Sequence, residues 1–174
     1  MKVVLSSEDG SQRAEGRGLR AEAGRQTSKT REQTIEGWVK MAERISSFRE
    51  LKAYKAARSL AQELFEESKA WPKEEVYSMT SQIRRSSRAV GAALAEAWAK
   101  RSYPAHFLSK LTDADAELQE TCHWIETANE CEYLPPEKKE ELLQAAREIG
   151  KMIGMMMLKH ESFCRTAGTK AANP

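Results

Sequence analysis

The sequence of 174 residues has few cysteines, prolines, glycines and aromatic residues, and it has no long hydrophobic run. Its mean hydropathy of -0.67 excludes a membrane-spanning chain. With only 5 prolines and 9 glycines, a collagen-like or low-complexity chain is also excluded. Three cysteines, Cys122, Cys131 and Cys164, form no Cys-x-x-Cys pair, and an odd number argues against a disulfide framework. We therefore expect one soluble domain in the reducing cytoplasm.

A large charge of one sign is also lacking. The 28 basic and 26 acidic residues give a formal net charge of +2, too little for a surface that binds phosphate over its whole area. A local basic patch is compatible with this balance. The opening segment MKVVLSSEDG has only three consecutive apolar residues, too few for a signal peptide, so we expect no targeting segment.

The two ends of the chain offer little to bury. Residues 1–46 are rich in charge and glycine, with almost nothing apolar between Leu19 and Ile35, and this composition predicts a flexible N-terminal extension. Met41 lies just before the first apolar periodicity. Two interpretations stay open: Met41 is the native start, or the extension is a genuine flexible arm. Residues 166–174 are expected to form a flexible tail.

Residues 47–165 contain four stretches with helical periodicity and none with strand alternation. The first runs from about Ser47 to Ser68, with Ser47 and Glu50 as a capping box. The others open at Pro72, near Pro104 and after Pro135-Pro136. Helices of this length, joined by short turns that contain proline, predict an all-α, antiparallel, up-down-up-down four-helix bundle with a crossing angle of about 20°.

Seven-residue spacing predicts the core faces. On the second helix these positions are Val76, Ile83, Val90 and Ala97, with Met79, Ser86 and Ala93 beside them. Small side chains there let a neighbouring helix approach closely. On the fourth helix the predicted core positions are Leu142, Ala145, Ile149, Met152, Met156 and Phe163.

Charge is uneven along the predicted helices. Residues 78–101 hold five basic residues and one acid, whereas residues 105–132 hold one basic residue and seven acids. We expect part of this charge to be neutralised in a structural polar layer formed by Arg85 with Glu96, Asp113 and Glu117. Replacement of Arg85 by Ala is then expected to weaken folding or assembly.

Two surfaces are candidates for partners. The side chains of Arg84, Arg88, Lys100 and Arg101 are either a basic stripe for RNA phosphates or a solvated helix face. The second candidate surface consists of a methionine cluster near the end of the fourth helix and a tryptophan that precedes a turn. These side chains either fill the core adaptably or contact another protomer. As an oligomer interface we single out Trp98, Met155, Met156 and Met157.

Catalytic and metal motifs are scarce. Glu120 and His123 have the Glu-x-x-His spacing of di-iron bundles, but neither His106 nor His160 has a glutamate three residues earlier, so the second copy is missing. There is no phosphate-binding loop and no defensible Ser/His/Asp arrangement. We expect no catalytic residues, no metal and no cofactor.

Several short motifs resemble one bacterial family in their order and spacing. These are Phe48-Arg49-Glu50-Leu51, Trp71-Pro72-Lys73-Glu74-Glu75, Ser81-Gln82-Ile83-Arg84-Arg85-Ser86, Phe107-Leu108-Ser109-Lys110-Leu111 and Asp115-Ala116-Glu117-Leu118-Gln119-Glu120-Thr121. Over residues 47–160 the chain is similar to the four-helix bundle proteins called 23S ribosomal RNA intervening-sequence proteins, or S23 proteins. It departs where members commonly have Asn-Ile-Ala-Glu-Gly, since Ala93 and Ala97 replace the Asn and Gly and Glu96 is kept.

The resemblance implies a small cytoplasmic homopentamer with no established catalytic activity. A distant relative is the accessory variability protein of diversity-generating retroelements, a basic bundle that binds nucleic acid and a reverse transcriptase. We therefore expect a non-enzymatic homo-oligomeric scaffold that is associated with ribosomal RNA and acts through multivalency. The alternative is a nucleic-acid-binding accessory protein that recruits a reverse transcriptase or another ribonucleoprotein partner. No membrane partner is expected.

Overall fold

The computed structural model describes residues 45–164, which lie in one compact unit, Glu43–Pro174. The predicted N-terminal extension lies outside the described residues except for its last two. The predicted C-terminal tail lies wholly outside them.

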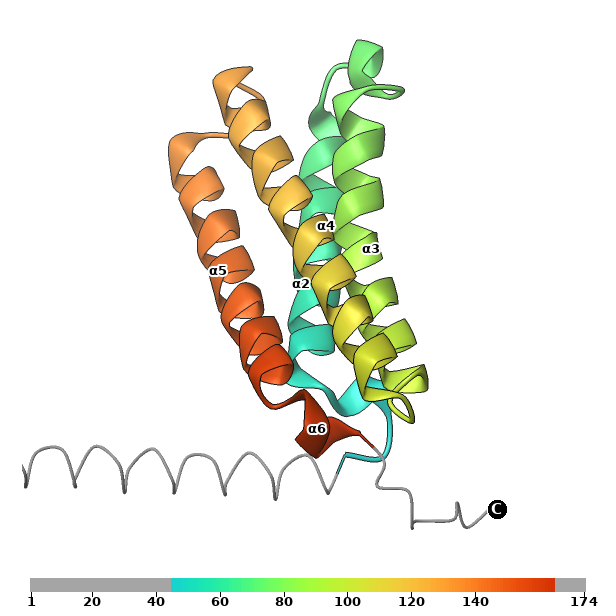
Figure 1. Ribbon diagram of the computed structural model, residues 1–174. Coiled ribbons are helices and arrows are strands. Elements are labelled where there is room, and N and C mark those ends of the chain that lie inside the picture. The colour runs from blue at the N-terminus through green and yellow to red at the C-terminus, as the bar shows by residue number, and fades with distance from the viewer. Residues whose placement is uncertain (1–44, 165–174) are drawn as a thin grey trace, which may run out of the picture. The chain divides into compact units, whose positions relative to one another are not determined.

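Four long helices account for most of the described chain (Figure 1). They are α2 (Lys52–Glu67), α3 (Met79–Ala99), α4 (Pro104–Glu130) and α5 (Pro136–Leu158). A short helix, α6 (His160–Phe163), and three 3-10 turns complete the set: η1 (Phe48–Glu50), η2 (Ser68–Ala70) and η3 (Lys73–Glu75). No strand occurs among residues 45–164. The predicted all-α class is confirmed.

Contacts between helices define their directions. Arg84, near the start of α3, bonds Ser68 just after α2, and Lys110, near the start of α4, pairs with Glu96 near the end of α3. Lys138, near the start of α5, contacts Glu63 near the end of α2. Each contact joins the beginning of one helix to the end of another, so these neighbours run in opposite directions (Figure 1).

The chain enters α2 through a 3-10 turn, which differs in detail from the predicted capping box. The Ser47 hydroxyl accepts a hydrogen bond from the Arg49 N–H at 3.3 Å, so Ser47 is a cap. The Glu50 carboxylate, however, accepts from the hydroxyl and N–H of Ser46 rather than returning to Ser47. This bonding lowers the pKa of Glu50. The cap therefore serves η1, and α2 begins only at Lys52.

The second of the four predicted helices, α3, starts later than the sequence predicts. Residues after Pro72 form η3, and α3 begins at Met79 instead of at the proline. The Glu75 carboxylate accepts hydrogen bonds from the Ser78 hydroxyl and from the Met79 N–H, which otherwise has no partner at a helix start. These bonds lower the pKa of Glu75. Val76 is 44% exposed, so the first position of the predicted core face is wrong.

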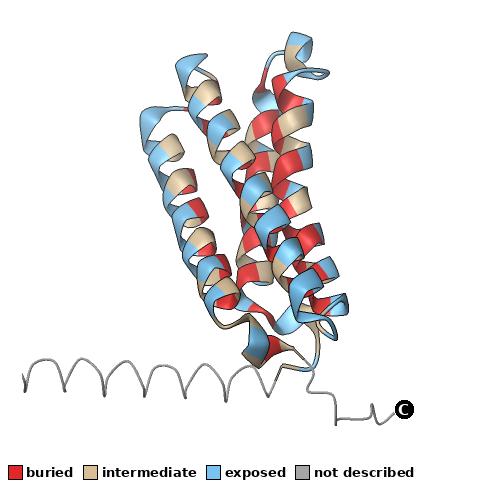
Figure 2. Cartoon of the chain, viewed as in Figure 1, coloured by how far each residue is buried: buried red, intermediate tan, exposed pale blue. Residues whose placement is uncertain are grey.

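The core lies between the four long helices, on the face that each turns toward the others (Figure 2). On α3, Ile83, Val90 and Ala97 are buried as predicted. On α5, two predicted positions are wrong by one residue, because Ala146 and Ile153 are buried where Ala145 and Met152 were expected. In both pairs two apolar residues are adjacent, so the sequence pattern leaves the rotation of the helix undecided.

Candidate nucleic-acid interface

A groove of about 890 Å³ runs between α2 and α3 and is open to solvent. We call it the basic groove and define it by its lining residues: Phe48, Arg49, Tyr54, Lys55, Ala57, Arg58, Ser59, Ala61, Gln62, Phe65, Ser87, Arg88, Gly91, Ala92 and Ala95. Positions 54, 58, 61 and 65 are three or four residues apart on α2, and positions 88, 92 and 95 are similarly spaced on α3. Each helix therefore presents one face to the groove.

The basic groove carries positive charge only. Its lining includes Arg49, Lys55, Arg58 and Arg88 and no carboxylate. Among residues 45–164, none of these four cations takes part in an ion pair. Their positive charge is therefore available to an anionic ligand.

Carboxylates that border the basic groove in sequence are bound elsewhere. Glu50 accepts from Ser46, Glu66 pairs with Lys69 at 2.6 Å, and Glu96 pairs with Lys110 at 2.9 Å. The hydrogen bond from Lys110 lowers the pKa of Glu96, and the bond from Lys69 lowers the pKa of Glu66. Glu66 and Glu96 are therefore neutralised by lysines outside the basic groove, whereas Glu50 is bonded to uncharged groups of Ser46 and interacts electrostatically with Lys55 of the groove.

Aromatic rings line the basic groove beside the cations. Phe48 and Tyr54 meet edge to face with ring centroids 4.9 Å apart, and the Arg49 guanidinium lies 4.6 Å from the centre of the Phe48 ring. At the other end, the guanidinium of Arg88 lies 5.4 Å from the centre of the Phe65 ring. Cation–π contacts of this kind hold the guanidinium groups against the helices while their edges stay accessible.

Small residues form the floor. A Cβ added at Gly91 would meet the Tyr54 ring at 3.7 Å, an ordinary van der Waals distance, so the Tyr54 ring packs directly over the α3 backbone. Ala57, Ala61 and Ala95 extend this floor. The groove is open because small residues line its floor. Its four cations are exposed to solvent.

The predicted basic stripe is divided in the structure. Arg84 and Arg88 share the Phe65 ring, and Arg84 Nε also donates to Ser68 Oγ at 2.7 Å. Lys100 and Arg101 lie beyond the other end of α3, where Arg101 Nη1 donates to the Trp98 carbonyl at 2.7 Å. Only Arg88 of the four predicted residues lines the basic groove.

Sequence reasoning missed the contribution of α2. Lys55 and Arg58 on α2, with Arg49 on the preceding turn η1, supply three of the four cations, and the sequence prediction for this segment rests on its apolar spacing and its cap. The signal was present, since Lys55 and Arg58 are three residues apart and therefore neighbours on one helix face. What the sequence did not reveal is that this face adjoins Arg88 on α3.

Arg85 does not join Glu96, Asp113 or Glu117. Its Nη2 pairs with Glu120 at 2.6 Å, and Glu120 also accepts from the Trp124 indole at 3.3 Å. Glu96 and Asp113 instead share Lys110, and each lies within 3.0 Å of its ammonium group. The predicted four-residue polar layer is therefore replaced by two separate clusters at the surface between α3 and α4.

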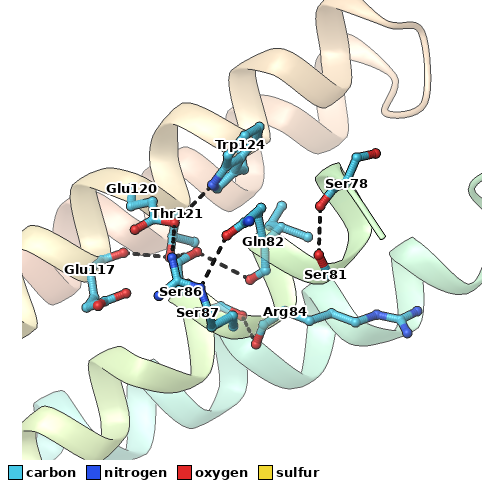
Figure 3. Close-up of polar contacts among 12 residues, drawn as sticks. Ser78, Ser81, Gln82, Arg84, Ser86, Ser87, Glu117, Glu120, Thr121 and Trp124 are labelled. Carbon is cyan, nitrogen blue, oxygen red and sulfur yellow. Dashed lines mark hydrogen bonds and ion pairs between the residues drawn. The ribbon is translucent and has the colours of Figure 1, made fainter. Parts of the chain in front are cut away.

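The buried polar contact between α3 and α4 involves hydroxyl groups (Figure 3). Thr121 Oγ1 lies 3.1 Å from Ser86 Oγ and 2.8 Å from the Glu117 carbonyl oxygen, and both hydroxyl residues are fully buried. The Glu117 backbone, rather than its carboxylate, takes part in this contact. Hydroxyl groups bonded to carbonyls one turn earlier satisfy their own hydrogen bonds at small volume.

The predicted interface residues divide into buried and accessible groups. Trp98 and Met156 are 6% and 3% exposed and pack inside the protomer, so they are core residues rather than surface residues. Met155 and Met157 are partly exposed and adjoin Leu158, which is 70% exposed. The exposed apolar surface formed by these residues therefore lies at the C-terminal end of α5.

Within residues 45–164, no three His, Cys, Asp or Glu side chains gather into a metal site. Glu120 of the Glu-x-x-His motif is bonded to Arg85 and Trp124, and His123 lies against the Trp124 ring.

Burial raises the pKa of the Cys122 and Cys164 thiols, which keeps both protonated and weakly nucleophilic. In the part of the chain that the structure describes, every helix is too short or too polar to cross a bilayer.

Comparisons with known proteins identify one family. Residues 49–155 match the family described as 23S rRNA-intervening sequence protein. The chain is also similar to the crystal structure of a protein of unknown function from the S23 ribosomal protein family of Bacteroides thetaiotaomicron, with 28% sequence identity and a TM-score of 0.56. That similarity covers 61% of this chain and 95% of the other. No curated protein matches.

Proposed function

Because the chain belongs to the 23S rRNA-intervening sequence protein family, we propose that it is a non-enzymatic, RNA-binding scaffold that contacts RNA through the basic groove. One observation supports this most strongly: four cations line the groove with no carboxylate among them and no ion pair within the described residues. Lysine and arginine side chains that contact phosphates release counterions from the nucleic acid, and this release supplies sequence-independent affinity.

The chemistry of the basic groove favours binding over catalysis. Its ionisable side chains are three arginines, one lysine and one tyrosine, and it contains no imidazole, thiol or carboxylate. General acid–base catalysis near neutral pH needs a group that exchanges a proton there, and guanidinium groups do not. Guanidinium groups instead bind phosphate oxygens through paired N–H donors.

The proposal is tested with full-length protein carrying Arg58→Gln and Arg88→Gln together. Both side chains are exposed, so the fold should be retained. We expect affinity for a structured RNA to fall at least roughly tenfold at low salt, and the dependence of log K on log salt to become shallower by about 0.7 per lost contact with a single-stranded region. Filter binding at two salt concentrations measures both quantities.

The matched control is Lys151→Gln, which also removes an exposed cation but lies on α5, where it pairs with Glu148 at 2.7 Å. It should leave both affinity and salt dependence unchanged. The control removes one positive charge and the Arg58/Arg88 variant removes two, so a loss in the control of about half the loss in the variant would show that only total charge matters. That outcome would contradict a role for the basic groove.

We further propose that the protein acts as a homo-oligomer, for which the resemblance to the family suggests five copies. Supporting it is the partly exposed apolar end of α5, formed by Met155, Met157 and Leu158. Several copies would present several identical grooves to one RNA, and weak contacts would then add through effective concentration. Native mass spectrometry tests the assembly: a monomeric mass at micromolar concentration would contradict it.

Recruitment of a reverse transcriptase stays a prediction from the sequence.

A further inference from the structure

The basic groove offers stacking surfaces as well as charge. Three aromatic side chains, Phe48, Tyr54 and Phe65, lie among its lining residues, and none of them is fully buried. Unpaired bases stack on aromatic rings and guanidinium planes, while the edges of guanidinium groups bind phosphates. We propose, resting on the function proposed above, that the basic groove binds single-stranded RNA in preference to duplex RNA.

The geometry of the groove supports this selectivity. Tyr54 and Phe65 lie on one face of α2, three turns apart, which separates them by about 16 Å along the helix axis. The rings therefore lie along the groove, above its alanine and glycine floor. The cationic groups of Lys69, Arg84 and Arg88 lie 4.7, 4.9 and 5.4 Å from the centre of the Phe65 ring, so a flat, unpaired base would stack there on guanidinium planes as well as on the ring. The bases of a duplex are stacked on each other, so a duplex would meet only the cations.

The positions of the cations suit a strand that follows the groove. Arg58 lies on α2 and Arg88 on α3, so both helices contribute positive charge to the groove. Lys55 lies beside Tyr54, and Arg49 covers the Phe48 ring. A positively charged groove that follows the backbone, combined with rings for successive bases, is the usual arrangement in proteins that bind single strands without sequence preference.

The alternative ligand of the basic groove is a helix from a second copy of the protein, because a groove lined by small residues can also accommodate a helix. Such a helix would have to bring carboxylates to four cations. Some carboxylates on α4 and α5 are paired within their own helices, as Asp113 is with Lys110, but others, such as Asp115 and Glu126, take part in no ion pair among residues 45–164. What favours a nucleic acid over a helix is the combination of cations with aromatic rings in the lining, because phosphates contact the cations and bases stack on the rings.

The test compares two fluorescently labelled RNAs of equal length, an unstructured strand and a duplex, binding to the full chain and to Tyr54→Leu. Leucine keeps apolar volume over Gly91 but removes the ring. For the single strand we expect a loss of about 5- to 100-fold, and for the duplex a change of less than about twofold, because phosphate contacts are kept. A 2-aminopurine base in the single strand should be quenched by the wild-type protein and not by the variant.

The matched control is Tyr77→Leu, which removes a tyrosine that is 94% exposed and lies outside the groove. It should bind both RNAs as the wild type does. Salt-dependent binding of both RNAs with equal affinity, unaffected by Tyr54→Leu, would overturn the selectivity and leave the proposed function standing. Absence of salt-dependent binding to either RNA would overturn the proposed function itself.

A second variant keeps the inference testable if Tyr54→Leu fails to fold. Ala92 is an exposed residue of the groove, and Ala92→Leu would fill part of the groove while replacing neither an aromatic nor a charged residue. We expect it to weaken binding of the single strand while the oligomer mass is unchanged. A changed oligomer mass with unchanged affinity for RNA would assign the groove to a contact between protomers and overturn the inference.

Discussion

Glu132 follows α4 with a backbone φ of 60°, in the left-handed region where a side chain is disfavoured. The turn is fixed by its neighbours: the N–H groups of Tyr133 and Leu134 both donate to the Ala128 carbonyl, and Asn129 Nδ2 donates to the Leu134 carbonyl at 2.8 Å. Glycine commonly occupies such a position after a helix because it has no Cβ. Glu132 therefore costs stability that the surrounding hydrogen bonds offset.

Replacing Glu132 with Gly should stabilise the protein. Relief of the left-handed strain outweighs the extra freedom that glycine gives the unfolded chain, so we expect the free energy of unfolding to rise by about 0.5–1 kcal/mol. Urea denaturation followed by circular dichroism measures this change. Glu132→Val, with a branched Cβ, should lower it. If both variants lost stability equally, the carboxylate rather than the backbone would be the important feature.

Arg85 illustrates how far the sequence determines a side-chain contact. Adjacent residues on a helix point about 100° apart, and Arg84 and Arg85 do bind different partners, Ser68 just after α2 and Glu120 on α4 respectively. The choice of Glu120 over Glu117, one turn away, depends on the register of α3 against α4, which no spacing within one helix fixes. Because the Arg85 side chain is 58% exposed and that of Glu120 is 32% exposed, Arg85→Ala should reduce the free energy of unfolding by less than about 1 kcal/mol.

Helices α3 and α4 pack along a row of small residues. On α3 this row includes Ser86 and Ala93, both buried, with Ala97 further along the helix. Ser86 faces Thr121 of α4 across a distance of 3.1 Å between their hydroxyl oxygens. Such an approach leaves no volume for a longer side chain at position 86. The close packing of the two helices thus depends on the size of a few residues.

Enlarging Ser86 should disturb this packing. We expect Ser86→Leu to lower the free energy of unfolding by about 1–3 kcal/mol, since a buried leucine has to displace α4 or leave its preferred rotamer. Ser86→Ala is the control, and it should change stability by less than about 1 kcal/mol because Thr121 keeps the Glu117 carbonyl as a partner. Thermal unfolding by calorimetry compares the two. Equal stability of the two variants would show that the helices are not in close contact here.

The existence of the four long helices could be predicted from the sequence, but the residue at which α3 begins could not. Proline at Pro104 and Pro136 marks the starts of α4 and α5 because its missing N–H is not needed in the first turn. Proline at Pro72 gives the same signal, yet only a 3-10 turn follows, because Glu75 reaches forward to cap α3 at Met79. A side chain four residues from a helix start decided the boundary, and such a contact is visible only in three dimensions.

Charge is separated across the bundle as a whole. The four cations of the basic groove, on η1, α2 and α3, take part in no ion pair among residues 45–164, whereas lysines of α4 and α5 lie among carboxylates. Lys138 contacts Glu63, Glu67 and Glu141, and its hydrogen bonds to Glu63 and Glu141 raise its pKa well above the ordinary lysine value. The net charge of the whole chain hides this separation, so the groove could be predicted only by knowing which two helices are neighbours.

If several copies present the basic groove, affinity should depend on RNA length in two steps. A strand that fills one groove should bind weakly, and a strand long enough to span two grooves of one assembly should bind roughly 100-fold or more tightly, since the second contact is intramolecular. Fluorescence anisotropy over a series of unstructured strands measures this dependence on the full chain. Arg88→Gln should weaken the long strand by more than the short one, because every copy loses the same contact. A smooth, linear rise of affinity with length would instead indicate independent binding by single protomers.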